Sequence, residues 1–305
     1  MPRNPRGFLG TWGLVLLVIA VLVLALLFLG SARQRGGVSA TISQRVWGNV
    51  TVVPTGVSVP YARLYVLVDN NPWDSLQASW GLSIFVETPW GNVLFDTGPD
   101  PGTLAYNAKR LGINPCNVSA VVISHEHMDH VGGLPYIARH CPDVPVYVPS
   151  GISSSVLSWI KSLGLHNIRV VNTTTIVVPG IYVLPPLWGP PAEESLAINT
   201  SRGLVLLVGC SHPGVARIVK HAEQLLHERI LLLMGGFHLA WAPRNEVEKI
   251  AKELVGLGVE YIAPIHCSGS LMHSILASKY PSHYIGAHVG TVVVIGDGCS
   301  IICVR

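Results

Sequence analysis

The sequence carries little charge. Only 12% of its 305 residues are Asp, Glu, Lys or Arg, and the formal net charge is +3. Lys and Arg never occur in a run longer than two residues. Nucleic-acid binding needs clustered cations that face the phosphates. The composition therefore predicts no nucleic-acid partner, and a chain of this length can hold one large domain or two small ones.

Several familiar catalytic motifs are also missing. No G-x-S-x-G sequence occurs, so the chain lacks the strained turn that presents a nucleophilic serine in α/β-hydrolases. It contains neither a P-loop nor the G-x-G-x-x-G motif that holds a dinucleotide pyrophosphate. Serine-based hydrolysis and nucleotide-dependent chemistry therefore have no support in the sequence.

One long segment lacks charge altogether. Residues 7–32 carry none, and residues 8–30 are almost continuously apolar. A helix rising about 1.5 Å per residue over this length spans a hydrocarbon core of about 30 Å. We predict a single-pass N-terminal membrane anchor, with a cleaved signal peptide as the alternative, because Arg3 and Arg6 precede the apolar run. Arginines on both sides leave the side of the membrane open, and an extracytoplasmic domain is compatible with the sequence.

The predicted organisation is then an anchor or signal peptide over residues 1–32, a linker over 33–44 and a folded domain over 45–305. The six cysteines do not fix the redox compartment. Cys116 and Cys141 could pair, and Cys299 and Cys303 could each pair elsewhere.

The most informative motif is Ser-His-Glu-His-Met-Asp-His at residues 124–130. It directly follows residues 120–123, an apolar run without alternation that predicts a buried strand. We therefore expect the motif on the loop leaving that strand, with a helix beginning at about residue 132.

This spacing predicts two metal sites. Neutral imidazoles and a carboxylate suit divalent zinc first, with manganese or iron also compatible. His125 and His127 can point to one metal, and Asp129 and His130 to a second about 3.5–4 Å away. A His-rich surface loop is the alternative, and the further motifs downstream argue against it.

Other candidate residues also follow predicted strands, where an α/β scaffold gathers its functional loops. Asp96 could orient ligand histidines. His212 is a candidate third ligand of the first metal, and Cys210 is either a thiolate ligand or a small buried residue. His238 is a candidate for substrate contact or catalysis, and His266 for ligation of the second metal.

The element pattern predicts an α/β fold. Each half of the chain has short β-branched runs followed by strand–helix units, which favours two sheets packed face to face with helices outside. The predicted strands cover residues 50–53, 64–68, 82–87, 92–95, 120–123, 144–148, 168–171, 175–178, 181–184, 204–208, 230–234 and 261–264. The predicted helices cover residues 103–111, 132–139, 215–228, 246–257 and 270–278, and a final hairpin covers 291–304.

These motifs resemble the metallo-β-lactamase superfamily. The resemblance rests on Leu94-Phe-Asp-Thr-Gly, on His125-x-His-x-Asp-His and on the later isolated histidines. Gly81-Leu-Ser, Gly209-Cys-Ser-His, Gly235-Gly-Phe-His and His266-Cys-Ser-Gly are similar to a narrower group. That group is named for the 7,8-dihydropterin-6-methyl-4-(β-D-ribofuranosyl)aminobenzene-5′-phosphate synthase, and the similarity covers residues 45–297.

The resemblance implies an αββα sandwich with a site for two divalent metals at one edge of the sheets. It implies His125, His127 and His212 on one metal, and Asp129, His130 and His266 on the other. Two departures stand out. Cys210 occupies the position where many superfamily hydrolases have a bridging aspartate, and Trp80 replaces a residue that is often polar in the narrower group.

The expected function is that of a metal-dependent transferase or hydrolase acting on a phosphorylated or pyrophosphorylated small molecule. Asp129 is the candidate proton acceptor. The first alternative is a hydrolase of esters, lactones or phosphodiesters. The second is a membrane-tethered binding protein with a vestigial site, although the retained cluster of ligand types argues against it.

Overall fold

The computed structural model describes residues 46–47, 50–51, 56–296, 298 and 302–304. The chain divides into two compact units, Met1–Ser43 and Gln44–Arg305, and every described element belongs to the second. The predicted membrane anchor over residues 8–30 lies outside the described residues. Among the helices that are described, none has the length and apolar character needed to cross a membrane.

The first sheet has eight strands in the order β16-β15-β3-β4-β5-β6-β7-β8. Its antiparallel part runs from β16 to β5, and its parallel part from β5 to β8. The strands are β3 Tyr61–Val68, β4 Ser83–Glu87, β5 Val93–Phe95, β6 Ala120–Val122, β7 Val146–Pro149, β8 Ile168–Val171, β15 Val292–Gly296 and β16 Ile302–Val304.

The second sheet has six strands in the order β14-β13-β12-β11-β10-β9. Strands β12, β13 and β14 are parallel to one another, and the others pair antiparallel. The strands are β9 Thr175–Val178, β10 Ile181–Trp188, β11 Ala192–Thr200, β12 Gly203–Val208, β13 Ile230–Gly235 and β14 Tyr261–Pro264. A separate pair is formed by β1 Val46–Trp47 and β2 Val50–Thr51.

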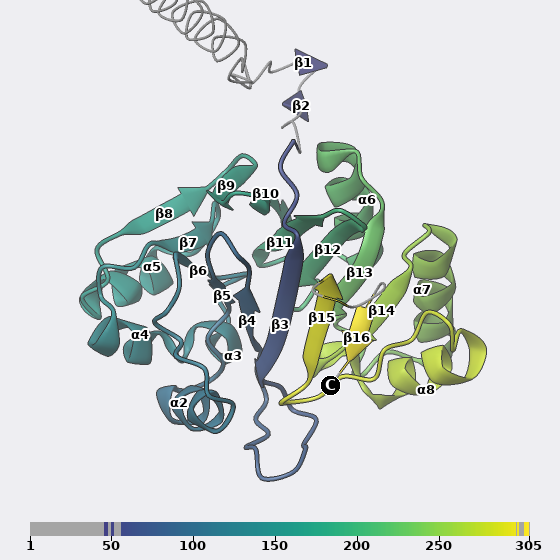
Figure 1. The fold of residues 1–305 in the computed structure, drawn as a ribbon, viewed down its shortest axis with the longest axis horizontal. Coiled ribbons are helices and arrows are strands. Elements are labelled where there is room, and N and C mark those ends of the chain that lie inside the picture. Colours follow the sequence, from purple (N-terminus) through teal and green to yellow (C-terminus); the bar gives the residue numbers. More distant parts are fainter. Residues whose placement is uncertain (1–45, 48–49, 52–55, 297, 299–301, 305) are drawn as a thin grey trace, which may run out of the picture. The chain divides into compact units, whose positions relative to one another are not determined.

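Helices cover the outer faces of both sheets (Figure 1). Beside the first sheet lie α2 Pro101–Arg110, α3 Met128–Val131, α4 Leu134–His140 and α5 Ser154–Ser162. Beside the second lie α6 Val215–Leu226, α7 Arg244–Gly256 and α8 Ser270–Lys279, with a short 3-10 helix η2 at His266–Ser268.

The alternation of side chains along each strand builds the layers. In β12, Val205 and Leu207 enter the core between the two sheets, whereas Leu204, Leu206 and Val208 pack under the helices of the second sheet. Both faces of such a strand are buried, which explains its unbroken apolar sequence. The same two-sided burial holds for the first sheet. The predicted αββα sandwich is confirmed.

The structure adds local detail to the predictions and corrects one of them. The predicted loop after β6 is wrong in part, because α3 begins at Met128 inside the histidine motif, and the following helix begins at Leu134 rather than near residue 132. Helix α5 and strand β11 were not predicted at all. Of the cysteine pairings left open, Cys116 and Cys141 form a disulfide.

Candidate metal centre

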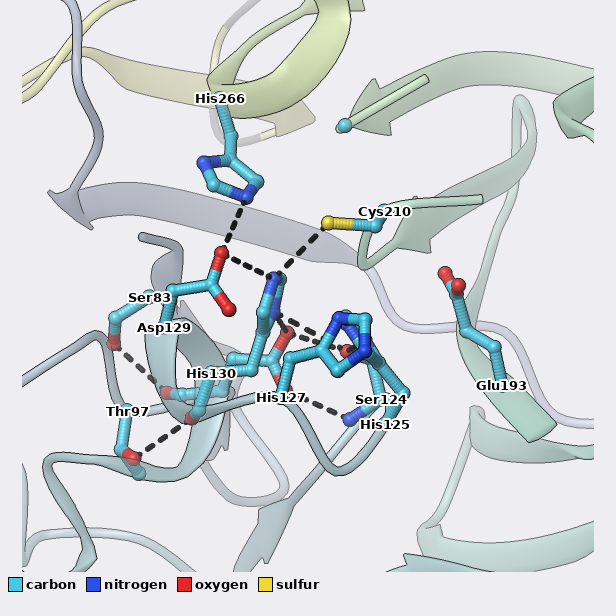
Figure 2. A network of polar contacts seen from close by, with 12 residues as sticks. Ser83, Thr97, Ser124, His125, His127, Asp129, His130, Glu193, Cys210 and His266 are labelled. Atoms are coloured by element: carbon cyan, nitrogen blue, oxygen red, sulfur yellow. Dashed lines mark hydrogen bonds and ion pairs between the residues drawn. The ribbon is translucent and has the colours of Figure 1, made fainter. Parts of the chain in front are cut away.

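The candidate residues meet where strands of both sheets end. Asp96 follows β5, and residues 124–130 follow β6 in the first sheet. Cys210 and His212 follow β12, and His266 follows β14 in the second. Parallel strands bring their carboxyl ends to the same edge, so loops distant in sequence converge there. Figure 2 shows the side chains from these loops pointing toward one another.

The first group of potential ligands contains His125, His127 and His212. One ligand atom from each lies within 4.8 Å of the others. His125 Nε2 and His127 Nδ1 are 3.2 Å apart, and the rings of His127 and His212 have centroids 4.8 Å apart. His125 is buried whereas His127 is exposed, so the group opens to solvent on one side.

The second group contains Asp129, His130, Cys210 and His266, again with ligand atoms within 4.8 Å of one another. Asp129 Oδ2 lies 3.3 Å from His266 Nε2 and 3.8 Å from His130 Nε2. His130 Nε2 lies 3.2 Å from the Cys210 sulfur. Figure 2 shows this convergence, with His266 above the Asp129 carboxylate and Cys210 beside His130.

Two of the histidines have their Nδ1 atoms held by groups of the first sheet. Asp96 Oδ2 lies 2.6 Å from His130 Nδ1 and also accepts the Ser124 hydroxyl at 2.7 Å. The same hydroxyl lies 2.9 Å from His125 Nδ1. Fixing one ring nitrogen sets the orientation of the other. Asp96 therefore contacts the candidate ligand His130 directly and the candidate ligand His125 through Ser124.

Two further histidines are held in the same way. Glu193 Oε2 lies 2.9 Å from His212 Nδ1, and the two oxygens of this carboxylate also accept the backbone N–H groups of His212 and Ser211. Asn70 Oδ1 lies 3.2 Å from His266 Nδ1, and Asp69 accepts the backbone N–H of His266 at 2.6 Å. In all four histidines Nε2 is the nitrogen left for a ligand role.

Burial and neighbouring charges fix the protonation of these groups. Burial, together with the surrounding imidazoles, lowers the pKa of His125 well below its usual value, and lowers that of His127 as well. Burial opposes the charge of His130, yet the Asp96 carboxylate raises the pKa of His130 to about 8. Burial would raise the pKa of Asp129, but His266 and His130 hold it well below its usual range.

The donor set fits divalent metal ions. Ligand atoms about 2.0–2.3 Å from one zinc ion must lie roughly 3–4 Å from one another, and the separations of 3.2, 3.3 and 3.8 Å in the second group fall in that range. His266 Nε2 is buried and makes no hydrogen bond among the described residues. Its contact with Asp129 Oδ2 at 3.3 Å leaves this buried nitrogen without a hydrogen bond, which is costly, and a metal in the second group would satisfy it.

Backbone strain is concentrated at the same edge. Four residues here have a positive φ, between 50° and 60°, which residues other than glycine seldom adopt: Asp96, Ser211, His238 and His266. Each left-handed residue costs of the order of 1–3 kcal/mol and persists only when its surroundings enforce it. The strained conformations therefore lower the stability of the fold, and they bring these loops together at one edge of the sheets.

A glycine makes room between the two sheets. A Cβ atom at Gly209 would lie 2.2 Å from the Ser124 hydroxyl and 3.0 Å from His125 Nδ1. The end of β12 can approach the histidine motif only because this residue has no side chain.

His238 lies at the margin of the first group. It forms a third cluster with Cys210 and His212, and its ring centroid is 4.6 Å from that of His212. Its backbone N–H donates to the Cys267 sulfur at 3.3 Å. Contact with Cys267 raises the pKa of the exposed His238 imidazole. The structure thus brings His238 together with the ligand groups without placing it inside either one.

Sequence analysis missed Glu193, Asp69 and Asn70. None belongs to a recognised motif, and each acts only through a contact formed by folding. For Glu193 the sequence held one indication, because an acidic pair followed by Ser195 and the apolar run at residues 196–198 is unusual in a strand.

The fold is an αββα sandwich with two adjacent histidine-rich groups of potential metal ligands at one edge. The sequence profile of the metallo-beta-lactamase superfamily matches residues 81–243, and the chain belongs to that superfamily.

Several relatives are similar over most of the chain. The 7,8-dihydropterin-6-methyl-4-(beta-D-ribofuranosyl)-aminobenzene-5′-phosphate synthase of Methanocaldococcus jannaschii is 25% identical over 76% of this chain and 96% of its own length. The crystal structure of Tm1679, described as a metal-dependent hydrolase of the beta-lactamase superfamily, superposes with a TM-score of 0.67 and 27% identity, covering 77% of this chain and all 100% of Tm1679.

A diphosphatase of the PhnP family also shares the fold. Its TM-score is 0.53 at 18% identity, over 77% of this chain and 97% of the diphosphatase.

Proposed function

We propose that this protein is a metal-dependent enzyme that cleaves a phosphoester or pyrophosphate bond of a small molecule, by hydrolysis or by transfer of the organic group. The observation that carries the proposal is the pairing of two donor groups in which four of the five histidines, all except His127, have Nδ1 held by another side chain and Nε2 left to bind a metal. The name of the synthase relative adds weight to a phosphorylated substrate.

Each of the two metal ions would have its own set of protein ligands. His125, His127 and His212 would hold one metal ion, and Asp129, His130, Cys210 and His266 the other. Bound divalent ions would polarise the electrophile, activate water and neutralise the leaving oxyanion. Zinc suits the imidazole and thiolate donors best, with manganese or iron as alternatives.

Two side chains, Asp129 and His238, would supply charge to the metal and a proton to the leaving group. Asp129 is ionised because His266 and His130 lower its pKa, so it contributes negative charge to the second metal more readily than it accepts a proton. His238 is exposed, and its ring lies beside His212. That position suits a group that contacts substrate and delivers a proton to the departing oxygen.

A second candidate is the hydrolysis of a carboxylic ester or lactone. In the described part of the chain, no Lys or Arg makes a hydrogen bond or ion pair with a residue of the two donor groups. Phosphate recognition commonly uses such cations, so the metals alone would have to bind a phosphate. A neutral ester makes no such demand.

The test compares substrates on one metal-loaded protein. The full-length chain would be incubated with zinc, manganese or iron and with a dihydropterin-methyl pyrophosphate plus ribofuranosylaminobenzene phosphate, with products followed by mass spectrometry. Phosphodiester and lactone substrates would be tried in parallel. His127→Ala should abolish any genuine turnover, whereas His166→Ala, an exposed histidine outside the site, should not.

Each result has a distinct meaning. A coupled product supports transfer, and pyrophosphate or phosphate release without coupling supports hydrolysis. Turnover of the lactone alone supports the second candidate. Metal-loaded protein without turnover of any of these, or equal turnover in the His127→Ala protein, would contradict the proposed function.

We also propose that the enzyme domain is exported and tethered to a membrane through residues 8–30. The apolar sequence of that segment supports the tether. The Cys116–Cys141 disulfide supports export, because such bonds persist mainly in oxidising compartments. Digestion of intact and of lysed cells with a protease that cannot cross the membrane would show on which side of the membrane the enzyme domain lies.

A further inference from the structure

Two exposed tryptophans stand beside the second donor group. Trp80 is 43% exposed and Trp241 is 77% exposed. Their rings form a pair with centroids 5.4 Å apart and an angle of 39° between the planes. The Trp80 ring also lies 5.0 Å from the ring of His266. An aromatic surface therefore begins at a candidate metal ligand and extends into solvent.

The Trp80 backbone is fastened to the metal loop. The N–H of Leu82 donates to the carbonyl of Asp129 at 3.2 Å. A Cβ atom at Gly81 would lie 2.6 Å from that same carbonyl oxygen, so only glycine allows this approach. Trp80 is thus positioned by the residue that contributes the carboxylate of the second group.

The Trp241 backbone is fastened to the loop after His266. The N–H groups of Leu239 and Ala240 both donate to the carbonyl of Cys267, at 2.9 and 3.0 Å. A Cβ atom at Gly269 would lie 2.5 Å from the Ala240 Cα. Both tryptophans are therefore held by the same loops that present potential metal ligands, and their spacing to those ligands is built into the backbone.

The ring faces remain available to a ligand. The cation–π contacts of the described residues are Arg63 over Tyr61 and Arg169 over Tyr147, so no internal cation covers either tryptophan. A tryptophan can bury about 150–250 Å², yet these two leave much of that area in water. Rigid, exposed rings next to a chemical centre suit the recognition of another ring by stacking.

We propose that the substrate carries a planar aromatic or heteroaromatic ring that packs against Trp80 and Trp241 while its scissile group lies at the metal groups. This inference rests on the proposed function and names the substrate class. The ring is joined to the reacting group by a short linker, because the Trp80 ring is in contact distance of His266.

The experiment measures binding rather than turnover. The zinc-loaded full-length chain would be titrated calorimetrically with three non-hydrolysable probes: methylphosphonate, benzylphosphonate and cyclohexylmethylphosphonate. The last two differ in planarity but little in size. We expect benzylphosphonate to bind about tenfold more tightly than its saturated counterpart. Trp80→Ala and Trp241→Ala should each reduce that preference, and Trp80→Phe should retain most of it.

Trp90→Ala is the matched control. Trp90 is also 43% exposed, but it lies in the turn between β4 and β5, at the far ends of those strands from Ser83 and Asp96. Its loss should leave the preference unchanged.

The outcomes separate the two proposals. Equal binding of the two six-membered probes, or a preference that survives both alanine substitutions, overturns the aromatic site while methylphosphonate binding upholds the metal site. If methylphosphonate does not bind to the zinc-loaded chain at all, the proposed function fails, and the present inference fails with it.

Discussion

Glu193 and His212 are joined twice, because Oε2 of the carboxylate lies 2.9 Å from Nδ1 of the imidazole and 2.9 Å from the backbone nitrogen of the same residue. Since the Ser211 N–H donates to the other oxygen, each of these hydrogen-bond partners of the carboxylate is a donor. Glu193→Gln would turn an NH₂ group toward one of those donors. We expect a 10- to 100-fold loss of affinity for the metal held by His212, measured by competition with a chelator.

The adjacent residue supplies the control for that experiment. Glu194 is buried, and both of its carboxylate oxygens lack a hydrogen-bond partner among the described residues. Glu194→Gln should leave metal affinity unchanged. If both substitutions weakened metal binding equally, the effect would belong to the strand rather than to the contact with His212.

The buried carboxyl of Glu194 should also make the free energy of unfolding depend on pH. Burial, with a smaller contribution from Asp96, raises the pKa of Glu194 well above its usual value. The folded protein therefore keeps the proton that the unfolded chain loses above its ordinary pKa, so the free energy of unfolding falls as pH rises above that value. Glu194→Gln removes this dependence. Denaturant titrations should show a variant more stable than the parent at pH 7–8, with the difference shrinking toward pH 4.5.

The two donor groups should differ in the pH dependence of metal uptake. In the metal-free protein the pKa of His130 is about 8, so this imidazole carries a proton below that pH and must release it before Nε2 can bind a metal. Affinity at the second group should fall at least tenfold per pH unit below 8, because the Cys210 thiol, whose pKa is raised by its contact with Cys267 and by burial, must also release its proton. His125 and His127, with lowered pKa values, are already neutral there.

Calorimetry in buffers of different ionisation enthalpy would count the released protons. Asp96→Asn removes the carboxylate that raises the pKa of His130 and leaves burial to lower it, so the pH dependence should move to lower pH. Equal pH slopes for the two groups would contradict this account.

Gly209 tests the steric argument directly. A methyl group there would meet Ser124 and His125, so Gly209→Ala should disturb both and weaken metal binding at least tenfold. Gly256→Ala is the matched control, because nothing lies within 4 Å of its Cβ position, at the end of α7. Metal content after purification would distinguish the two variants, and retained metal in Gly209→Ala would show that the loop can move aside.

The parts of the fold that the sequence predicts well are those with two-sided burial. Strand β6 and strand β12 are short, unbroken apolar runs, and each leads directly into candidate ligands. The lack of alternation between apolar and polar residues marks such strands, because both of their faces must be apolar. Their ends then locate His125, His127 and His212 without any knowledge of the topology.

Strand β11 shows where that reasoning stops. It begins with Ala192-Glu-Glu, and polar residues of this kind argue against a buried strand when the sequence is considered alone. Glu193 is tolerated because it meets donors from a loop 18 residues away, whereas burial raises the pKa of Glu194 and so favours its neutral form. Asp69 and Asn70 escaped prediction for the same reason, since their contacts with His266 span 197 and 196 residues. Such partners become visible only when the topology is known.

The four cysteines whose side chains are described constrain the order in which the chain folds, binds metal and forms its disulfide. Cys116 and Cys141 are oxidised, whereas Cys210 and Cys267 are buried as free thiols, and Cys210 belongs to a donor group. An oxidant strong enough to close the first pair would attack the second in an unfolded chain. We therefore expect the β12 and β14 loops to become shielded, by packing or by metal, before the chain has been oxidised to completion. Refolding under oxidant without metal would then trap inactive protein with its thiols joined in the wrong pairs.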